Sequence, residues 1–116
     1  MMVTILKSKI HRAKVTGSDL NYEGSIAIDH RLMKSASLYE FEKVDIFNIN
    51  NGKRFSTYVI RGKPGEISLN GAAARLVQKD DLLIIVSYAQ IDESDLNSFK
   101  PKIILVDENN REIKKK

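Results

Sequence analysis

The dipeptide Asn51-Gly52 is the feature that most limits how this 116-residue chain can fold. It lies between two stretches rich in apolar, aromatic and β-branched residues, Val44 to Asn50 and Arg54 to Ile60. Asn and Gly both tolerate the positive φ angles of a tight turn, so the pair predicts a β-hairpin. At least part of the fold is therefore expected to consist of antiparallel strands.

Other segments extend this β pattern. Asp81 to Gln90 contains a near-continuous apolar run, which is typical of a strand buried on both faces. Two short helices are predicted, at His30 to Ala36, where Asp29 can cap the first turn, and at Ala72 to Leu76, where alanine favours helix. Further short strands are predicted at residues 2–7, 10–16, 25–29, 66–69 and 102–107. The chain is therefore predicted to be mainly β.

Many short strands with few helices favour a compact barrel, because closure of a sheet removes its exposed edges. The sequence has no internal repeat, and its prolines stand only at positions 64 and 101, so no proline-rich linker divides it. We expect one domain over residues 1–116, with residues 108–116 forming a flexible tail.

Composition excludes several classes of function. Apolar residues make up 42% and charged residues 29%, as in globular proteins rather than disordered ones. The absence of cysteine excludes disulfides, thiolate metal sites and cysteine nucleophiles, and His11 and His30 do not have the spacing of metal ligands. No apolar run reaches membrane-spanning length, and charged residues interrupt the first segment. We expect a soluble, cytoplasmic protein without a metal or a membrane partner.

The net charge of +4 is a weak indication of nucleic-acid binding. Without the terminal run Lys114 to Lys116, 16 basic residues face 15 acidic ones, and no basic stripe is interleaved with aromatic residues. We therefore expect no nucleic-acid partner. A small β-barrel module that binds nucleic acid and a purely structural oligomerisation domain remain the alternatives to an enzyme.

Four segments contain the residues whose side chains are best suited to catalysis or ligand binding. They are Lys9 to Thr16, Tyr22 to Ser25, Asn51 to Tyr58, and Asn70 to Ala74. In this order and spacing they resemble the pyruvoyl-dependent aspartate 1-decarboxylase family, and the octapeptide Asn-Gly-Lys-Arg-Phe-Ser-Thr-Tyr is the most specific of the four. The similarity runs from about residue 3 to residue 90 and is poor beyond it.

This resemblance implies a fold and an activity. The fold would be a small six-stranded double-psi β-barrel with short helices, assembled as a homotetramer with sites between neighbouring subunits. The activity would be that of a carboxy-lyase that converts L-aspartate to β-alanine and carbon dioxide, for pantothenate and coenzyme A biosynthesis. The cofactor would be a covalent pyruvoyl group made from Ser25, with no metal and no pyridoxal phosphate.

Cleavage between Gly24 and Ser25 would make that group. Attack of the Ser25 hydroxyl on the Gly24 carbonyl converts the amide to an ester, which an unstrained amide resists, so the fold must distort the peptide or stabilise the oxyanion. Loss of the Ser25 α-proton then expels the ester carboxylate, and hydrolysis of the dehydroalanine leaves pyruvoyl and ammonia. The products would be chains 1–24 and 25–116. An uncut precursor, or one that needs a helper protein, is also possible.

The resemblance assigns catalytic roles on this basis. The pyruvoyl group at position 25 would form a Schiff base with L-aspartate, and Tyr58 would return a proton to the product, since a phenol of pKa about 10 is protonated at neutral pH. Thr57 would assist cleavage by donating to the oxyanion at Gly24, and would also contact substrate. Strand alternation puts Thr57 and Tyr58 on opposite faces, so a bulge, a twist or a neighbouring subunit must bring both to one site.

The resemblance also implies which residues bind the substrate and which support the site. Lys9 and Arg54 would hold the two carboxylates of aspartate, because Arg can bind a carboxylate through two hydrogen bonds. The substrate loop would consist of Gly71, Ala72 and Ala73. The supporting residues would be Asn70, His11 and Tyr22. Each of these residues also has an ordinary structural explanation as a turn, strand or surface residue, and only their combination favours the enzyme.

Overall fold

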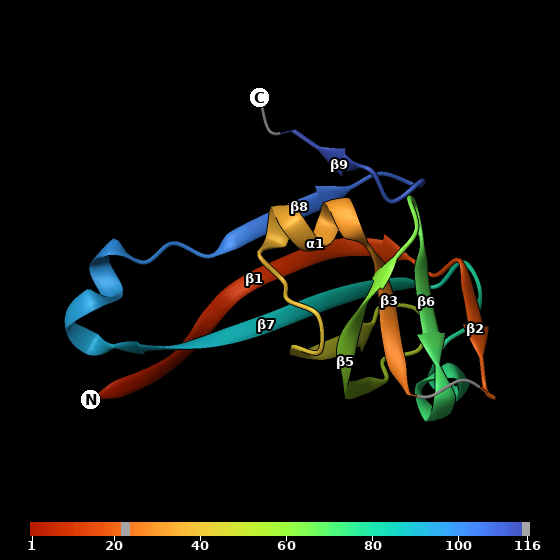
Figure 1. Ribbon diagram of the computed structural model, residues 1–116, viewed down its shortest axis with the longest axis horizontal. Helices are drawn as coiled ribbons and strands as arrows, with labels where there is room; N and C mark the ends of the chain where they lie inside the picture. Colours follow the sequence, from red (N-terminus) through yellow and green to blue (C-terminus); the bar gives the residue numbers. More distant parts are fainter. Residues whose placement is uncertain (22–23, 115–116) are drawn as a thin grey trace.

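One continuous hydrogen-bonded ladder of strands organises the computed structural model, which describes residues 1–21 and 24–114 (Figure 1). The order of strands in the ladder is β2-β6-β3-β5-β4-β7-β1-β8-β9. The molecule as a whole measures 44 × 32 × 25 Å. The strands are β1 (Met2–Lys14), β2 (Gly17–Asp19), β3 (Ser25–Asp29), β4 (Lys43–Asn48), β5 (Arg54–Gly62), β6 (Ile67–Asn70), β7 (Leu82–Asp92), β8 (Lys102–Val106) and β9 (Glu112–Ile113). The helices are α1 (His30–Ala36) and two short 3-10 helices, η1 (Gly71–Leu76) and η2 (Glu93–Ser98).

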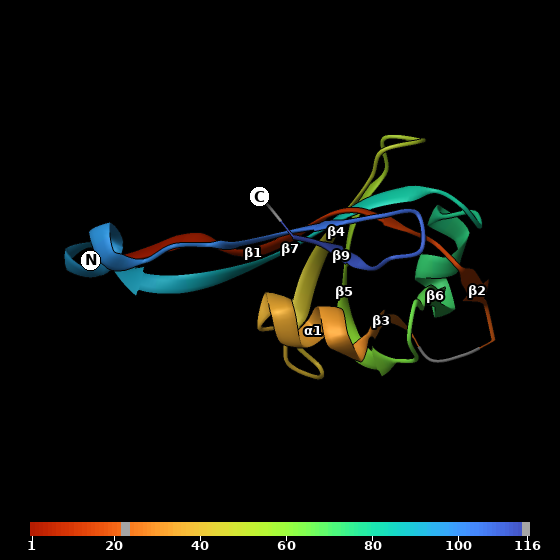
Figure 2. The ribbon, with the colours of Figure 1, turned by 90° about the horizontal axis from the view of Figure 1, so that it is seen from above.

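The prediction of a mainly β chain is confirmed, but the closed barrel is not found. The ladder of the described residues ends at β2 on one side and β9 on the other, and these strands contain only 3 and 2 residues. The long pair β1 and β7 extends well beyond the body and carries η2 at its tip, as both views show (Figures 1 and 2). The sheet of the described residues is therefore open.

β1 is one strand rather than the two predicted. It pairs with β7 along its whole length, with register shifts between Leu6 and Ser8 and between His11 and Ala13. Lys7 and Arg12 are the extra residues at these bulges, and Arg12 has φ 67°. The bulges bend the strand without breaking its pairing. The alternation of apolar residues is interrupted at both points, which explains the incorrect prediction.

The core lies around β3, all five residues of which are buried. β3 runs parallel to β5 and antiparallel to β6, and α1 packs against it. A Cβ at Gly62 would lie 2.9 Å from the carbonyl carbon and oxygen of Ile28, so only glycine allows β5 to approach β3 this closely. The largest fully buried aliphatic side chains of the core are Ile10, Ile26, Ile28, Ile46, Ile67, Leu69, Leu83 and Ile85.

Several local predictions are confirmed. The strand at residues 25–29 and the helix at His30–Ala36 have the predicted bounds, and Asp29 Oδ1 accepts a hydrogen bond from Arg31 N as the predicted cap. The Asn51-Gly52 hairpin joins β4 to β5, with Gly52 at φ 75°. The second predicted helix is the 3-10 helix η1 and begins one residue earlier, at Gly71. β2, η2 and β9 were not predicted.

The segment after β8 is attached to the sheet by Asn110. Its buried side chain accepts from Lys14 N at 2.7 Å and donates to Lys14 O at 2.8 Å and Gly65 O at 3.0 Å. The predicted flexibility of residues 108–116 stays a prediction, and residues 115 and 116 lie outside the described residues. No helix in the described part of the chain is long and apolar enough to cross a membrane.

Asp29 joins α1 to the loop after β5. Its carboxylate is 1% exposed, and it accepts from Arg31 N, from the Arg31 guanidinium at 2.8 Å and from Gly65 N at 2.7 Å. Burial alone raises the pKa of Asp29, but the hydrogen bonds from Arg31 and Gly65 outweigh it and lower the pKa from 3.8 to about 2. The ionised carboxylate therefore stabilises the folded chain.

We predict that Asp29→Asn lowers the free energy of unfolding at pH 7 by up to about 2 kcal/mol, an upper limit because the Arg31 guanidinium is half exposed. Because the folded pKa is depressed, the stabilisation is complete above pH 3.8 and is lost as the pH falls through about 2. Urea unfolding of the wild-type and Asp29→Asn proteins at several pH values measures this contribution to stability. Asp95→Asn, at an exposed carboxylate, is the matched control. A constant difference between wild type and Asp29→Asn from pH 5 to pH 2 would contradict the prediction.

Candidate functional site

Ser25 begins β3 at the point where the chain enters the core. Ser25 is 1% exposed, whereas Gly24 before it is exposed. In the antiparallel pair of β3 and β6, Ser25 lies opposite Asn70, and Asn70 Nδ2 donates a hydrogen bond to Ser25 Oγ at 3.1 Å. The Gly24–Ser25 peptide is thus accessible on one side while the hydroxyl that follows it is held inside the protein.

Thr57 and Tyr58 flank this junction on the neighbouring strand. β3 and β5 run parallel with Ile26 opposite Val59, so continuing the register places Tyr58 beside Ser25 and Thr57 beside Gly24. The pairing of β5 with both β3 and β4 runs residue to residue, without a shift. No bulge in the paired part of β5 therefore turns the two side chains to one face, and a twist or a neighbouring subunit stays the prediction. Tyr58 is half-buried, and its ring centroid lies 6.3 Å from that of Phe41.

The segment after β6 brings the predicted substrate loop to the same place. Asn70 is the last residue of β6 and stands at the N-cap position of η1, but its side chain donates a hydrogen bond to Ser25 and does not cap the helix. Gly71 follows with φ 65°, a conformation that glycine adopts without strain. Gly71 is buried, Ala73 packs against the core and Ala72 is exposed. The turn from Asn70 into η1 therefore directs this loop past Ser25.

The two predicted carboxylate-binding residues lie on different strands of the ladder. Lys9 is on β1, opposite Val86 of β7 and Ile103 of β8, and β5, β4 and β7 separate β1 from β3 in the ladder. Arg54 opens β5, where its guanidinium lies over the ring of Phe47 with Cζ 4.5 Å from the centroid. Four residues of strand, roughly 13 Å, separate Arg54 from Tyr58. Within one chain, three strands therefore stand between Lys9 and Ser25 in the ladder, whereas Arg54 lies on the strand next to that of Ser25.

His11 lies on β1 near Lys9, between Ile84 of β7 and Leu105 of β8. Its Nδ1 atom is buried and has no hydrogen-bond partner among the residues that the structure describes. Burial lowers the pKa of His11 below 6.5, and the nearby charges of Lys9 and Arg12 lower it further. A neutral imidazole with an unused buried nitrogen is therefore the expected form at neutral pH.

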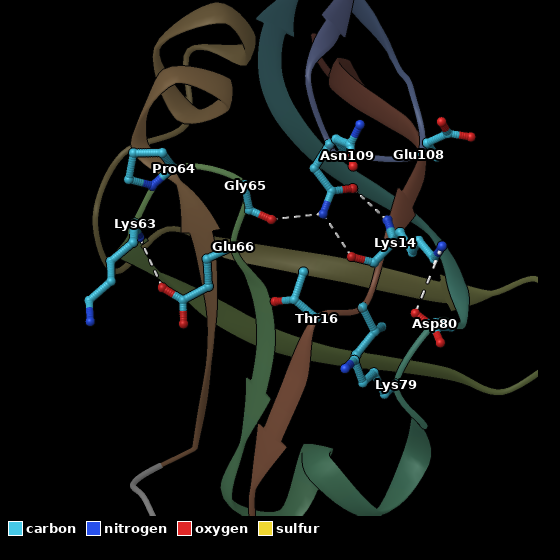
Figure 3. Close-up of a pocket in the computed structure, with 12 residues that line it drawn as sticks. Lys14, Thr16, Lys63, Pro64, Gly65, Glu66, Lys79, Asp80, Glu108 and Asn109 are labelled. Carbon is cyan, nitrogen blue, oxygen red and sulfur yellow. Dashed lines mark hydrogen bonds and ion pairs between the residues drawn. The ribbon is translucent and has the colours of Figure 1, made fainter.

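The largest pocket lies away from these residues. It has a volume of about 600 Å³ and opens between the end of β1, the loop at residues 63–66 and the turn at residues 108–110 (Figure 3). Its lysines and acidic residues are mixed, and Lys14 already pairs with Asp80 at 3.8 Å. None of the predicted site residues that the structure describes lines this pocket, so the candidate site is defined by Ser25 and not by this pocket.

The structure leaves one of the predicted supporting residues undescribed. Tyr22 lies outside the described residues, so its supporting role stays a prediction. Within residues 1–21 and 24–114, no group of three or more His, Asp or Glu side chains is arranged to hold a metal ion.

Sequence reasoning missed Asn48, which is 2% exposed in the hairpin before Arg54, and Phe41, which packs on Tyr58. The three asparagines close together at residues 48, 50 and 51 were the only sequence feature that could have pointed to Asn48.

Comparison with known proteins identifies the class: this β-rich chain, with a buried serine at an exposed Gly–Ser junction, is similar to carboxy-lyases. It is 62% identical over 106 residues to the aspartate 1-decarboxylase of Hydrogenobaculum sp., covering 91% of this chain and 85% of that protein. It is 60% identical over 110 residues to the aspartate 1-decarboxylase of Campylobacter hominis, covering 95% of this chain and 96% of that protein. Residues 1–113 match the aspartate decarboxylase family, and the chain belongs to that family.

We predict that His11 titrates below its ordinary pKa of 6.5, because burial and two cations oppose its protonation. Lys9→Met is expected to raise the pKa of His11 only part of the way towards 6.5, since burial is the largest cause. NMR titration of the imidazole protons measures both values. Because the folded pKa is depressed, His11 favours unfolding as the pH falls below 6.5. A His11 pKa at or above 6.5 in the wild-type protein would contradict this account.

Proposed function

We propose that this protein is an aspartate 1-decarboxylase that converts L-aspartate to β-alanine and carbon dioxide with a pyruvoyl group made from its own Ser25. The observation that carries the proposal is the position of Ser25: its hydroxyl is buried at the start of β3, fixed by Asn70 at 3.1 Å, directly after an exposed Gly24. Membership of the aspartate decarboxylase family supports the same activity.

The chain's own residues account for the cleavage. Ser25 Oγ attacks the Gly24 carbonyl carbon, the C–N bond breaks as the hydroxyl proton passes to the departing Ser25 nitrogen, and the Gly24 acyl group moves to Oγ as an ester. Thr57, beside Gly24 in the strand register, donates to the carbonyl oxygen as its negative charge develops. The Asn70 amide holds Oγ in one orientation during attack and donates to the same oxygen when it leaves. Loss of the Ser25 α-proton releases the Gly24 carboxylate, and water then replaces the nitrogen, which departs as ammonia.

The surroundings of Ser25 fit the small group that this cleavage leaves. The position is buried and lies on a central strand, so the new chain end is held by β5 and β6. A Cβ built at Gly24 would meet no heavy atom of the described residues within 4 Å, so these residues do not crowd the position just before Ser25. A pyruvoyl ketone supplies an electron sink for the bond to the departing carboxylate, as pyridoxal phosphate does in other decarboxylases.

The remaining residues bind aspartate and return a proton. Tyr58, beside Ser25 in the register, is the proposed proton donor to the carbon that loses the carboxylate. Arg54 binds the side-chain carboxylate through its planar guanidinium, and Lys9 supplies the second cation. The loop of Gly71, Ala72 and Ala73 contacts the substrate from the opposite side, where small side chains leave its backbone accessible.

We further propose that neighbouring subunits complete the site in a homotetramer. What supports this is that β5, β4 and β7 separate Lys9 and His11 from Ser25 within one chain. Large apolar side chains are also exposed, including Met2, Leu20, Tyr39 and Phe41, which is typical of surfaces that pack against another chain. The double-psi barrel remains part of the proposal. Its support is the hydrogen bond of Thr16 N to Ile67 O at 2.8 Å, which ties the end of β1 to β6.

We predict that Ser25→Ala abolishes both cleavage and the formation of β-alanine while the fold is retained, because only the attacking oxygen is removed. Gel electrophoresis counts the chains, and β-alanine released from L-aspartate is quantified by chromatography. Ser18→Ala is the matched control, since Ser18 is exposed on β2. Undiminished β-alanine formation by the Ser25→Ala protein would overturn the proposed function.

We predict a different result for Tyr58→Phe. The ring and its contact with Phe41 remain, so self-cleavage proceeds, but loss of the phenolic proton lowers kcat by roughly 10²- to 10⁴-fold. The measurement compares kcat per cleaved chain with the extent of cleavage, and Tyr88→Phe, at an exposed tyrosine of β7, serves as the control. A cleaved Tyr58→Phe protein with wild-type kcat would remove Tyr58 from the proposed mechanism.

A further inference from the structure

One backbone carbonyl joins the two halves of the proposed substrate site. Leu76 O, at the end of η1, accepts a hydrogen bond from Asn48 Nδ2 at 3.2 Å and another from Asn51 Nδ2 at 3.1 Å. A carbonyl oxygen has two lone pairs, so both donors can be satisfied at once. Both asparagines belong to the hairpin between β4 and β5, which is separated from η1 in the sequence by the whole of β5 and β6.

The elements that this carbonyl connects are those that carry the proposed substrate contacts. η1 begins with Gly71, Ala72 and Ala73 and ends at Leu76. The hairpin leads directly from Asn51 into Arg54, the first residue of β5. A shift of the hairpin relative to η1 therefore changes the distance between the guanidinium of Arg54 and the loop at residues 71–73.

The hairpin is rigid at the point where it makes this contact. Asn48 is 2% exposed, and its Nδ2 also donates to Asp81 Oδ2 at 2.8 Å. The same Asp81 oxygen accepts from Gln78 N at 2.9 Å, which fixes the chain just beyond η1. Within the turn, Asn51 Oδ1 accepts from Lys53 N at 2.9 Å. Displacement of the hairpin from η1 would thus break several hydrogen bonds together.

We propose that Asn51, together with the buried Asn48, is a positioning residue that sets the length of substrate the site accepts. By bracing the Arg54 hairpin against η1, the two amides hold the cation at the distance that suits L-aspartate and excludes L-glutamate, which is longer by one methylene group. Neither asparagine touches substrate in this account. The inference rests on the proposed function, because it needs Arg54 and residues 71–73 to bind the two ends of one substrate.

The expected effect is on binding and selectivity rather than on cleavage. A methylene group is commonly discriminated by about 10- to 200-fold, and a misplacement of about 1 Å in a site costs up to about 100-fold. Asn51→Ala is therefore expected to raise KM for L-aspartate and to reduce the ratio of kcat/KM for L-aspartate over L-glutamate by about 10-fold. The extent of cleavage at Ser25 should not change, because Asn70 and β3 are untouched.

The test uses the full-length cleaved protein and three variants. Asn51→Ala removes the donor to Leu76 O, and Asn51→Asp also removes it while keeping an acceptor for Lys53 N. Asn50→Ala is the matched control, since Asn50 is in the same turn but its Oδ1 accepts from Leu82 N rather than reaching η1. For each protein, the cleaved fraction, the melting temperature, and kcat and KM for both amino acids are measured.

The inference predicts loss of selectivity in both Asn51 variants and wild-type selectivity in Asn50→Ala, at similar melting temperatures. It is overturned if either Asn51 variant keeps the wild-type ratio, or if Asn50→Ala loses selectivity to the same degree. A wild-type protein that forms no β-alanine would refute the proposed function, and the inference with it. A wild-type enzyme with unaltered selectivity in the Asn51 variants would refute the inference alone.

Discussion

The hydrogen bond from Asn70 Nδ2 to Ser25 Oγ is the interaction on which the rest of the site depends. It exists because β3 is buried between β5 and β6, with Ser25 opposite Asn70 in the antiparallel register. The pairing with β6 fixes the hydroxyl, and the parallel pairing with β5 sets Thr57 and Tyr58 beside the Gly24–Ser25 junction. A one-residue slip of β3 against either neighbour would separate these groups, and its fully buried side chains oppose such a slip.

The functional groups are coupled through hydrogen bonds at the ends of strands. Asn70 closes β6 and starts η1, so the residue that orients Ser25 also begins the proposed substrate loop. At the other end of η1, Asn48 and Asn51 hold Leu76 O and tie the same helix to the hairpin of Arg54. Amide side chains suit this task because each can donate and accept without a charge that would have to be neutralised in a buried site.

Local parts of this fold were predictable because short-range chemistry dictates them. Asp29 caps α1 as its sequence position predicts, and Asn51-Gly52 makes the turn. Long-range features were not predictable. The bulges at Lys7 and Arg12 follow from pairing with β7, and the proximity of Asn48 to Leu76 follows from tertiary packing. Family resemblance supplied the roles of Lys9 and Arg54, which lie on β1 and β5 and which no local sequence pattern assigns to a substrate site.

Intact mass spectrometry of the purified native protein tests the central claim most directly, because it locates the break and identifies the new chain end in one spectrum. The account predicts two masses, one for residues 1–24 with an ordinary carboxyl end and one for residues 25–116 that is lighter by one ammonia than a chain beginning with serine. A catalytically active sample that consists only of the uncut chain, or whose larger fragment begins with an unmodified serine, would contradict it.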